Sequence, residues 1–187
     1  YHPPRNYKFP TQLPTAPWVY LTSMGETFKP FYDQLAGWLQ NNPNVKLAFN
    51  PGSWQLRVPV SDLQNILALT HIIYVNRREA EKMTNFGDSH GKDKELLVAL
   101  SKLGPKMCVI TDGGNGSFVY DAGGRDGQRF VKAGILPIDA FERTGAGDAF
   151  GSGFLSAVIK GKTLEEALLW GTINSASVIG YVGPQRG

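Results

Sequence analysis

The chain has 187 residues, of which 42% are apolar and 19% are charged, and its formal net charge is +3. This composition fits one folded domain with a sizeable core and excludes an intrinsically disordered chain. The small positive excess suits an anionic small-molecule ligand. It is far from the basic stripe of a nucleic-acid-binding protein, so no nucleic-acid partner is expected.

The sequence carries no signal for export or for a membrane. It has no run of 18 apolar residues, and Tyr1–Arg5 is neither a signal peptide nor a start with Met. Cys108 lies in an apolar run and is interpreted as core filler, and one cysteine allows no disulfide within the chain. We therefore expect a cytoplasmic protein, of which this chain is a fragment.

Apolar runs alternate with helical periodicity along the chain. Five prolines among the first 17 residues predict an extended lead-in over 1–17, followed by a structured part over 18–187. The predicted strands are 18–21, 45–49, 71–75, 107–111, 117–120 and 128–132, with glycine turns at 123–124 and 126–127 between the last two. The predicted helices are 27–40, 61–69 with Ser61 as N-cap, a short one from Arg77, 93–103, 146–160 and 163–181.

This alternation predicts an α/β fold, a three-layer α/β/α sandwich around a mostly parallel sheet, with a small antiparallel element after residue 111. Ligands of such sheets bind beyond the carboxyl ends of the strands. Asn76, the segment 111–116 and the segment 144–148 are all expected to lie just after strands. The sequence therefore nominates one site at which these segments converge.

The segment Thr144-Gly145-Ala146-Gly147-Asp148 precedes an amphipathic helix. Small residues at a helix start expose backbone N–H groups, and the helix dipole favours an anion there. Phosphoryl transfer needs such donors and a group that takes the acceptor proton. The amides of Gly145, Ala146 and Gly147 would form the anion hole, with Asp148 as the base. The alternative interpretation is a helix cap with an acidic first turn.

Three ordered motifs resemble those of the ribokinase (PfkB) family of sugar kinases. Residues 142–150, Glu-Arg-Thr-Gly-Ala-Gly-Asp-Ala-Phe, look like its C-terminal signature, usually Asp-Thr-Thr-Gly-Ala-Gly-Asp-Ala-Phe. Residues 76–79 match its Asn-x-x-Glu motif, and residues 111–116 match its nucleotide loop. The resemblance covers nearly the whole chain from Trp18 onward. It implies a ribokinase-like fold that lacks the family's N-terminal part and β lid.

The resemblance also implies roles for single residues. Asn76 and Glu79 would serve the triphosphate and its Mg²⁺, with Glu79 acting directly or through a water. Thr111, Gly113, Gly116 and Thr144 would lie along the ATP. The segment 171–176, with Thr172 and Asn174, resembles the helix that flanks the adenine, and 179–185 the loop that completes that wall. The alternatives are a capping pair at Asn76 and Glu79, simple turn glycines, and small residues that serve close helix packing.

Departures from the family pattern leave one cofactor open. Glu142 replaces the family's Asp, which contributes to a monovalent-cation site in some relatives, and Arg143 replaces Thr. The longer carboxylate leaves K⁺ dependence undecided. Other motifs fail: Gly161-Lys162-Thr163 lacks the earlier glycine of a P-loop because Ser156 stands there, no Gly-x-Gly-x-x-Gly exists, and the histidines lack zinc-ligand spacing.

Together these features predict an ATP-dependent carbohydrate kinase that phosphorylates a sugar hydroxyl, with Mg²⁺ as cofactor. The alternatives are a nucleoside kinase of the same family and a nucleotide-binding remnant without turnover. The family holds its acceptor mostly with the N-terminal half, under a lid that often makes a dimer. The fragment alone is therefore not necessarily active, and the parent could be a homodimer through the missing lid.

Overall fold

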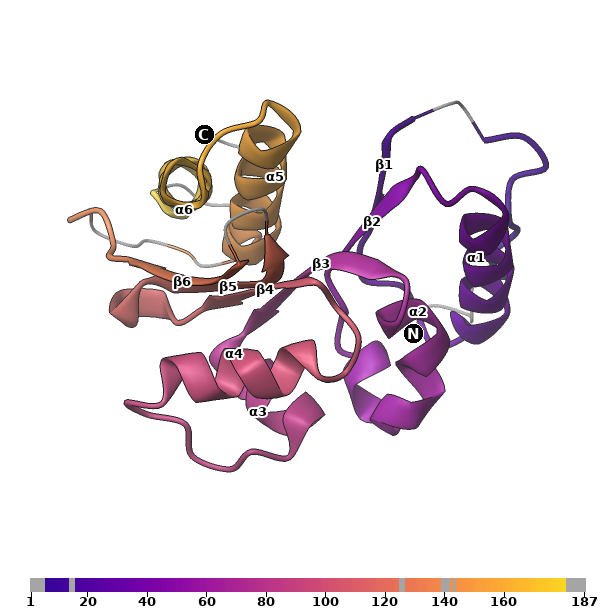
Figure 1. Cartoon of the computed structure of the whole chain (residues 1–187), viewed down its shortest axis with the longest axis horizontal. Coiled ribbons are helices and arrows are strands. Elements are labelled where there is room, and N and C mark those ends of the chain that lie inside the picture. The colour runs from indigo at the N-terminus through magenta and orange to yellow at the C-terminus, as the bar shows by residue number, and fades with distance from the viewer. Residues whose placement is uncertain (1–5, 14–15, 125–126, 139–141, 143, 181–187) are drawn as a thin grey trace.

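The computed structural model describes residues 6–13, 16–124, 127–138, 142 and 144–180. One six-stranded sheet runs through it in the order β1-β2-β3-β4-β5-β6 (Figure 1). Parallel pairing joins β1 (Trp18–Leu21), β2 (Lys46–Phe49), β3 (Thr70–Asn76) and β4 (Met107–Thr111). The strands β5 (Ser117–Gly124) and β6 (Gly127–Ala133) then pair antiparallel. The predicted sheet, with its antiparallel element after residue 111, is confirmed.

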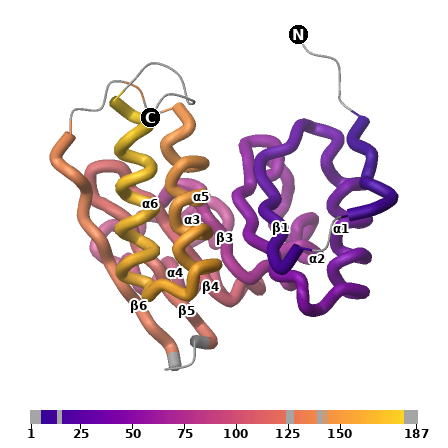
Figure 2. The backbone as a smooth tube through the Cα atoms, turned by 90° about the horizontal axis from the view of Figure 1, so that it is seen from above, coloured from indigo at the N-terminus to yellow at the C-terminus, as the bar shows by residue number. Residues whose placement is uncertain are grey.

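Helices cover both faces of the sheet, which makes the predicted three layers (Figures 1 and 2). One face packs against α1 (Lys29–Asn41), α2 (Gln64–Leu67), α3 (Arg77–Thr84) and α4 (Asp93–Ser101). The other packs against α5 (Ala146–Ile159) and α6 (Leu164–Ile179), which lie side by side in both views. Among the described residues no helix is long and apolar enough to cross a membrane.

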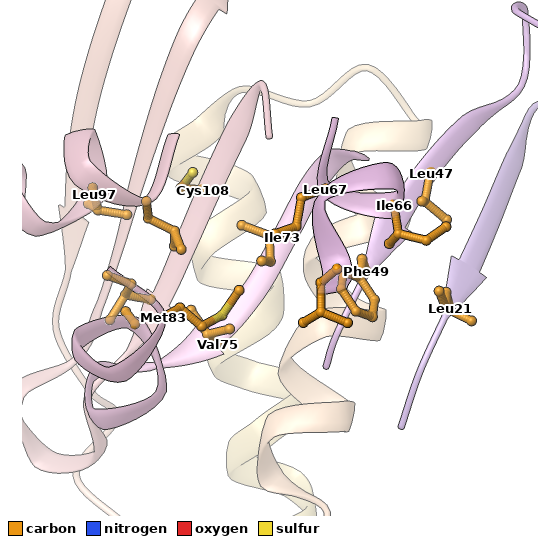
Figure 3. Packing of buried hydrophobic residues seen from close by; sticks show 14 of the residues in the cluster. Leu21, Leu47, Phe49, Ile66, Leu67, Ile73, Val75, Met83, Leu97 and Cys108 are labelled. Carbon is orange, nitrogen blue, oxygen red and sulfur yellow. The ribbon is translucent and has the colours of Figure 1, made fainter. Parts of the chain in front are cut away.

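The strand β3 shows why its sequence is a continuous apolar run. Ile73 and Val75 lie in the core under α1 to α4, whereas Ile72 and Tyr74 lie in the core under α5 and α6. Successive side chains point to opposite faces, so a strand covered on both faces needs apolar residues throughout. Figure 3 shows the first of these cores, in which Cys108 is fully buried, as the interpretation of this thiol as core filler requires.

Two details of the sequence prediction are wrong. The predicted helix 61–69 is a 3-10 turn η2 (Val60–Leu63) followed by the short α2, after another 3-10 turn η1 (Gln55–Arg57). Ser61 lies inside η2 and does not cap it, because the N-cap position is Pro59, whose extended backbone (ψ 142°) begins the turn earlier. The strand β5 continues through Gly123 and Gly124, so these glycines extend the hairpin arm rather than form its turn.

The described part of the lead-in packs against the domain. The backbone N–H of Gly25 donates to the Tyr7 hydroxyl at 2.6 Å. The rings of Tyr7 and Phe9 lie 6.5 and 5.4 Å from the ring of Phe31 on α1. This segment contains no helix or strand over 6–13 and 16–17, and its aromatic side chains cover part of α1.

Candidate active site

Two neighbouring hollows lie at the carboxyl edge of the parallel strands. Asn76 ends β3 and Thr111 ends β4, and the two residues are partners in the sheet register. A small hollow of about 170 Å³ is lined by both, together with Glu79 and the start of α5. A larger pocket of about 470 Å³ shares Thr111, Gly147 and Phe150 with it. The predicted convergence of three separate segments therefore exists in the structure.

Asp148 lies in the first turn of α5, with its side chain exposed at the small hollow. The helix begins after Gly145, whose φ of 83° lies in the left-handed region that favours glycine. No side chain caps this helix, and its first intrahelical bond here is Ala149 N–H to Gly145 carbonyl, 2.9 Å. The amides of Ala146, Gly147 and Asp148 precede that bond, so they are available to an anion.

Sequence reasoning missed Asn50, which follows β2. Its Nδ2 donates to Oδ1 of Asp148 at 3.3 Å, and its side chain lines the small hollow. The signal was nevertheless present, because Asn50 follows a parallel strand as Asn76 does, and the carboxyl ends of parallel strands share one edge.

Two tyrosines lie close to Asp148: Tyr74, which is buried and lines the small hollow, and Tyr20, which is half-buried. Burial raises the pKa of the Tyr20 phenol, the Asn50 side chain opposes that rise, and the charge of Asp148 adds to it. The Tyr20 hydroxyl makes no hydrogen bond of normal geometry with the described residues, and neither does that of Tyr74. The two rings meet edge to face at 5.9 Å. A Cβ at Gly151 would lie 2.4 Å from the Tyr20 hydroxyl, so glycine is needed there for α5 to approach the sheet.

Asn76 and Glu79 form a reciprocal capping box at the start of α3. The Asn76 side chain accepts from Glu79 N–H at 2.9 Å, and the Glu79 carboxylate accepts from Asn76 N–H at 2.8 Å. The capping pair, which was the alternative interpretation of this motif, is thus present in the structure. Burial raises the pKa of Glu79, and its hydrogen bonds to Asn76 oppose that rise. One carboxylate oxygen is used by the cap, and both residues still line the small hollow.

The glycine loop after β4 combines a structural glycine with open ones. Gly113 and Gly116 have φ of 51° and 91°. A Cβ at Gly116 would lie 2.1 Å from the carbonyl oxygen of Ala133, so this glycine lets β6 come close. A Cβ at Gly113 or Gly114 would meet nothing within 4 Å. The open side of the loop faces the large pocket, which Gly113, Gly114 and Gly116 line.

The helix α6 and the segment after β6 complete the large pocket. Thr172, Ser175, Ala176 and Ile179 line it from α6. Ile135, Leu136 and Ile138 line it from the segment after β6 and are 55%, 36% and 45% exposed, an apolar wall that sequence reasoning missed. The apolar run just after the last strand was the available signal.

Some predicted residues lie elsewhere. Asn174 does not line either hollow, and its Nδ2 donates to the Ala149 carbonyl at 2.7 Å, which joins α6 to α5. Thr144 is exposed in the turn before Gly145 and also lies outside both linings. Glu142 is placed near the end of α6, where its N–H donates to Ile179 carbonyl at 3.2 Å. The predicted wall 179–185 falls outside the described residues beyond 180.

The fold and this edge define an α/β protein with a ligand site over a mostly parallel sheet. Residues 12–187 match the family described as pfkB family carbohydrate kinase, and the chain belongs to that family. It is 33% identical over 136 residues to a cytidine kinase of Thermococcus kodakarensis, covering 72% of this chain and 46% of that protein. It is 31% identical over 154 residues to a ribokinase of Haemophilus influenzae, covering 81% and 47%.

The fold is also that of solved ribokinases. The structure of Arabidopsis thaliana ribokinase complexed with ribose and ATP matches 90% of this chain and 51% of that protein, with a TM-score of 0.72 and 21% identity. The ribokinase-like α/β fold expected from the sequence is thereby confirmed. The chain spans about half the length of the curated relatives it matches.

Proposed function

We propose that the protein containing this chain is an ATP-dependent kinase that transfers a phosphoryl group to a hydroxyl of a sugar. The observation that carries this proposal is the position of Asp148. Its carboxylate opens into the small hollow beside the uncapped amides of α5, and that hollow joins the large pocket. Membership of a carbohydrate kinase family supports the same reaction class.

The large pocket has the features expected of a nucleotide site. Its apolar wall at Ile135, Leu136 and Ile138 offers contact to a flat base, while the open glycines let a ligand approach the backbone. At the junction with the small hollow, the amides of Ala146 and Gly147 would bind the phosphates. The relative solved with ribose and ATP supports ATP as the phosphoryl donor.

The chemical step is an in-line displacement at the terminal phosphorus. The acceptor oxygen forms a bond to phosphorus as the bond to the bridging oxygen breaks, and ADP leaves. Asp148 takes the proton of the acceptor hydroxyl, and Asn50 orients the carboxylate through its 3.3 Å hydrogen bond. The amides at the start of α5 stabilise the charge that develops on the phosphoryl oxygens.

Glu79 and Asn76 fit a magnesium ion by their chemistry. Both offer side-chain oxygens at the edge of the small hollow, and Mg²⁺ prefers oxygen ligands while keeping several waters. When bound with the nucleotide, Mg²⁺ supplies charge neutralisation at the phosphates. Glu79 would hold it directly or through a water.

A nucleoside acceptor is the second candidate, favoured by the 33% identity to a cytidine kinase. A panel of ribose, cytidine, adenosine and fructose 6-phosphate separates the two candidates by kcat/KM on the full-length protein. A remnant without turnover would bind ATP and phosphorylate none of them.

The base is tested by Asp148→Asn in the full-length protein. We expect kcat to fall about 100-fold or more, because the proton acceptor is lost, while ATP affinity stays within about twofold. Coupled ADP production gives the rate, and calorimetry gives the affinity. The exposed Asp33→Asn on α1 is the control of equal charge change and should leave both unaltered. Equal loss of rate and affinity in Asp148→Asn would contradict the assignment of the base.

A further inference from the structure

Arg77 follows Asn76 directly, yet its guanidinium turns inward beneath α3. The residue is 5% exposed. Its Nε donates to Asp112 at 2.7 Å, its Nη2 to Asp93 at 2.5 Å, and its Nη1 to the hydroxyl and carbonyl oxygens of Ser89. One side chain thus joins the start of α3, the start of α4 and the end of β4.

Further charged groups border this cluster. Lys132 lies 3.7 Å from Asp93, and the Glu81 carboxylate accepts from the Ser89 hydroxyl at 2.6 Å. The Arg77 guanidinium also lies 5.3 Å from the ring centre of Phe118. Burial alone would lower the pKa of Arg77, but the hydrogen bonds to Asp93 and Asp112 outweigh it and raise that pKa. The guanidinium is therefore held as a permanent, multiply bonded cation.

Asp112 links the Arg77 side chain to the glycine loop at 113–116. Its carboxylate oxygen Oδ2 accepts from both Arg77 and Asn115 Nδ2, the latter at 3.0 Å. Its N–H donates to the Gly116 carbonyl at 2.8 Å, and its carbonyl accepts from Asn115 N–H at 2.9 Å. Neither Arg77 nor Asp112 lines a hollow, whereas Gly113, Gly114 and Gly116 do. The carboxylate thus lies behind the loop and fixes it from the side away from the pocket.

We propose that Arg77 is a positioning residue for nucleotide binding. Through Asp112 it fixes the position of the loop at 113–116 relative to Asn76 at the start of α3. This inference rests on the proposed function, because it assumes that the large pocket takes the nucleotide. Lysine does not replace it, since a point charge cannot make the forked contacts to Asp112, Asp93 and Ser89 at once. The Asp93 arm of the network serves the attachment of α4 and does not reach the loop.

The two arms of the network allow a matched experiment. ADP with Mg²⁺ is titrated calorimetrically into the full-length protein and its variants Arg77→Lys, Asp112→Asn and Asp93→Asn. We expect the Kd for ADP to rise about tenfold in Arg77→Lys and Asp112→Asn, because the loop moves. In Asp93→Asn it should change less than about twofold, although the melting temperature falls in all three. The double variant Arg77→Lys/Asp112→Asn should lose less than the product of the single losses.

Amide hydrogen exchange supplies a readout independent of binding. The N–H groups of Asn115 and Gly116, which bond within the loop, should exchange faster in Arg77→Lys and Asp112→Asn but not in Asp93→Asn. Unchanged ADP affinity in Arg77→Lys and Asp112→Asn, or an equal loss of affinity in Asp93→Asn, would overturn the positioning role of Arg77 but not the proposed function. Absence of ADP binding by the unsubstituted protein would overturn the proposed function, and the inference with it.

Discussion

The helices α3 and α5 both begin at the carboxyl edge of the sheet, but their first turns are satisfied in different ways. The start of α3 is closed by its own side chains, Asn76 and Glu79, in a capping box. The start of α5 has Gly145 at the N-cap position and no side-chain cap. A capped start uses its free N–H groups internally, whereas an uncapped start leaves them for a ligand. The contrast supports the proposed role of the α5 start in binding phosphate, while the start of α3 is held by its own side chains and carries carboxylate oxygens.

A carboxylate introduced at the start of α5 should have the largest effect, on the affinity for ADP. Gly147→Asp places a carboxylate beside the free amides of α5, where it would repel the nucleotide phosphates. We expect ADP affinity to fall about 100-fold, since like charges in a binding site cost several kcal/mol. Gly37→Asp on α1 is the matched control: a Cβ there also meets nothing within 4 Å and Gly37 lines neither hollow, so affinity should change little. Calorimetry with ADP measures both, and equal effects of the two substitutions would argue against a phosphate at these amides.

Removing the capping box at the start of α3 should have a smaller effect than the charge at Gly147, and part of that effect should be on stability. Asn76→Ala removes the cap of α3 and should lower the free energy of unfolding by about 1 kcal/mol. Thr163→Ala removes the same capping box from α6, at the opposite end of that helix from the pocket-lining residues, and should cost about as much. Urea denaturation compares the stabilities, and calorimetry compares ADP binding with and without Mg²⁺.

Only Asn76→Ala should weaken binding in the presence of Mg²⁺. If both variants bind ADP equally well, Asn76 serves the helix alone and takes no part in the site.

The raised pKa of Glu79 predicts the smallest effect, on pH dependence. The pKa of Glu79 in the folded state lies above its unfolded value of 4.5. At a pH between these two values, the folded state therefore holds a proton that the unfolded state has lost. The burial cost of the ionised carboxylate is fully present above the folded pKa and disappears as the pH falls below 4.5. Glu79→Gln, which can still cap, should therefore be more stable than the unsubstituted protein at pH 7, by less than about 1 kcal/mol.

That difference should vanish at acid pH, and Mg²⁺ with ADP should reverse it if Glu79 holds the ion. Thermal unfolding at several pH values measures the first, and the melting temperature with added Mg²⁺ and ADP measures the second. A stability difference that does not change with pH would show that Glu79 titrates normally.

Much of the frame was predictable because it depends on local patterns. The apolar runs at 71–75 and 107–111 predicted two central strands, and both are confirmed in neighbouring, parallel positions. Ligands of parallel sheets bind beyond the carboxyl ends of the strands, and this rule predicted one site for Asn76, Thr111 and Asp148. The helix 61–69 failed because a capping serine is a weak signal beside Pro59, which fixes the local backbone.

Side-chain contacts between distant residues were not predictable from these patterns. Asn50 and Asp148 are 98 positions apart and Arg77 and Asp112 are 35 apart, and each pair meets only once the strands have their order. The same holds for Asn174, whose sequence context suited either a pocket or helix packing and whose amide bonds Ala149.

The sequence by itself determined the order of the strands, the helix starts at Arg77, Asp93 and Ala146, and the family of this protein, because periodicity and motif spacing are local properties. Only the tertiary structure decided which helix start is open, which carboxylate faces a hollow and which basic side chain is buried. Those choices depend on packing between elements distant in the chain, where burial and charge pairing are settled together.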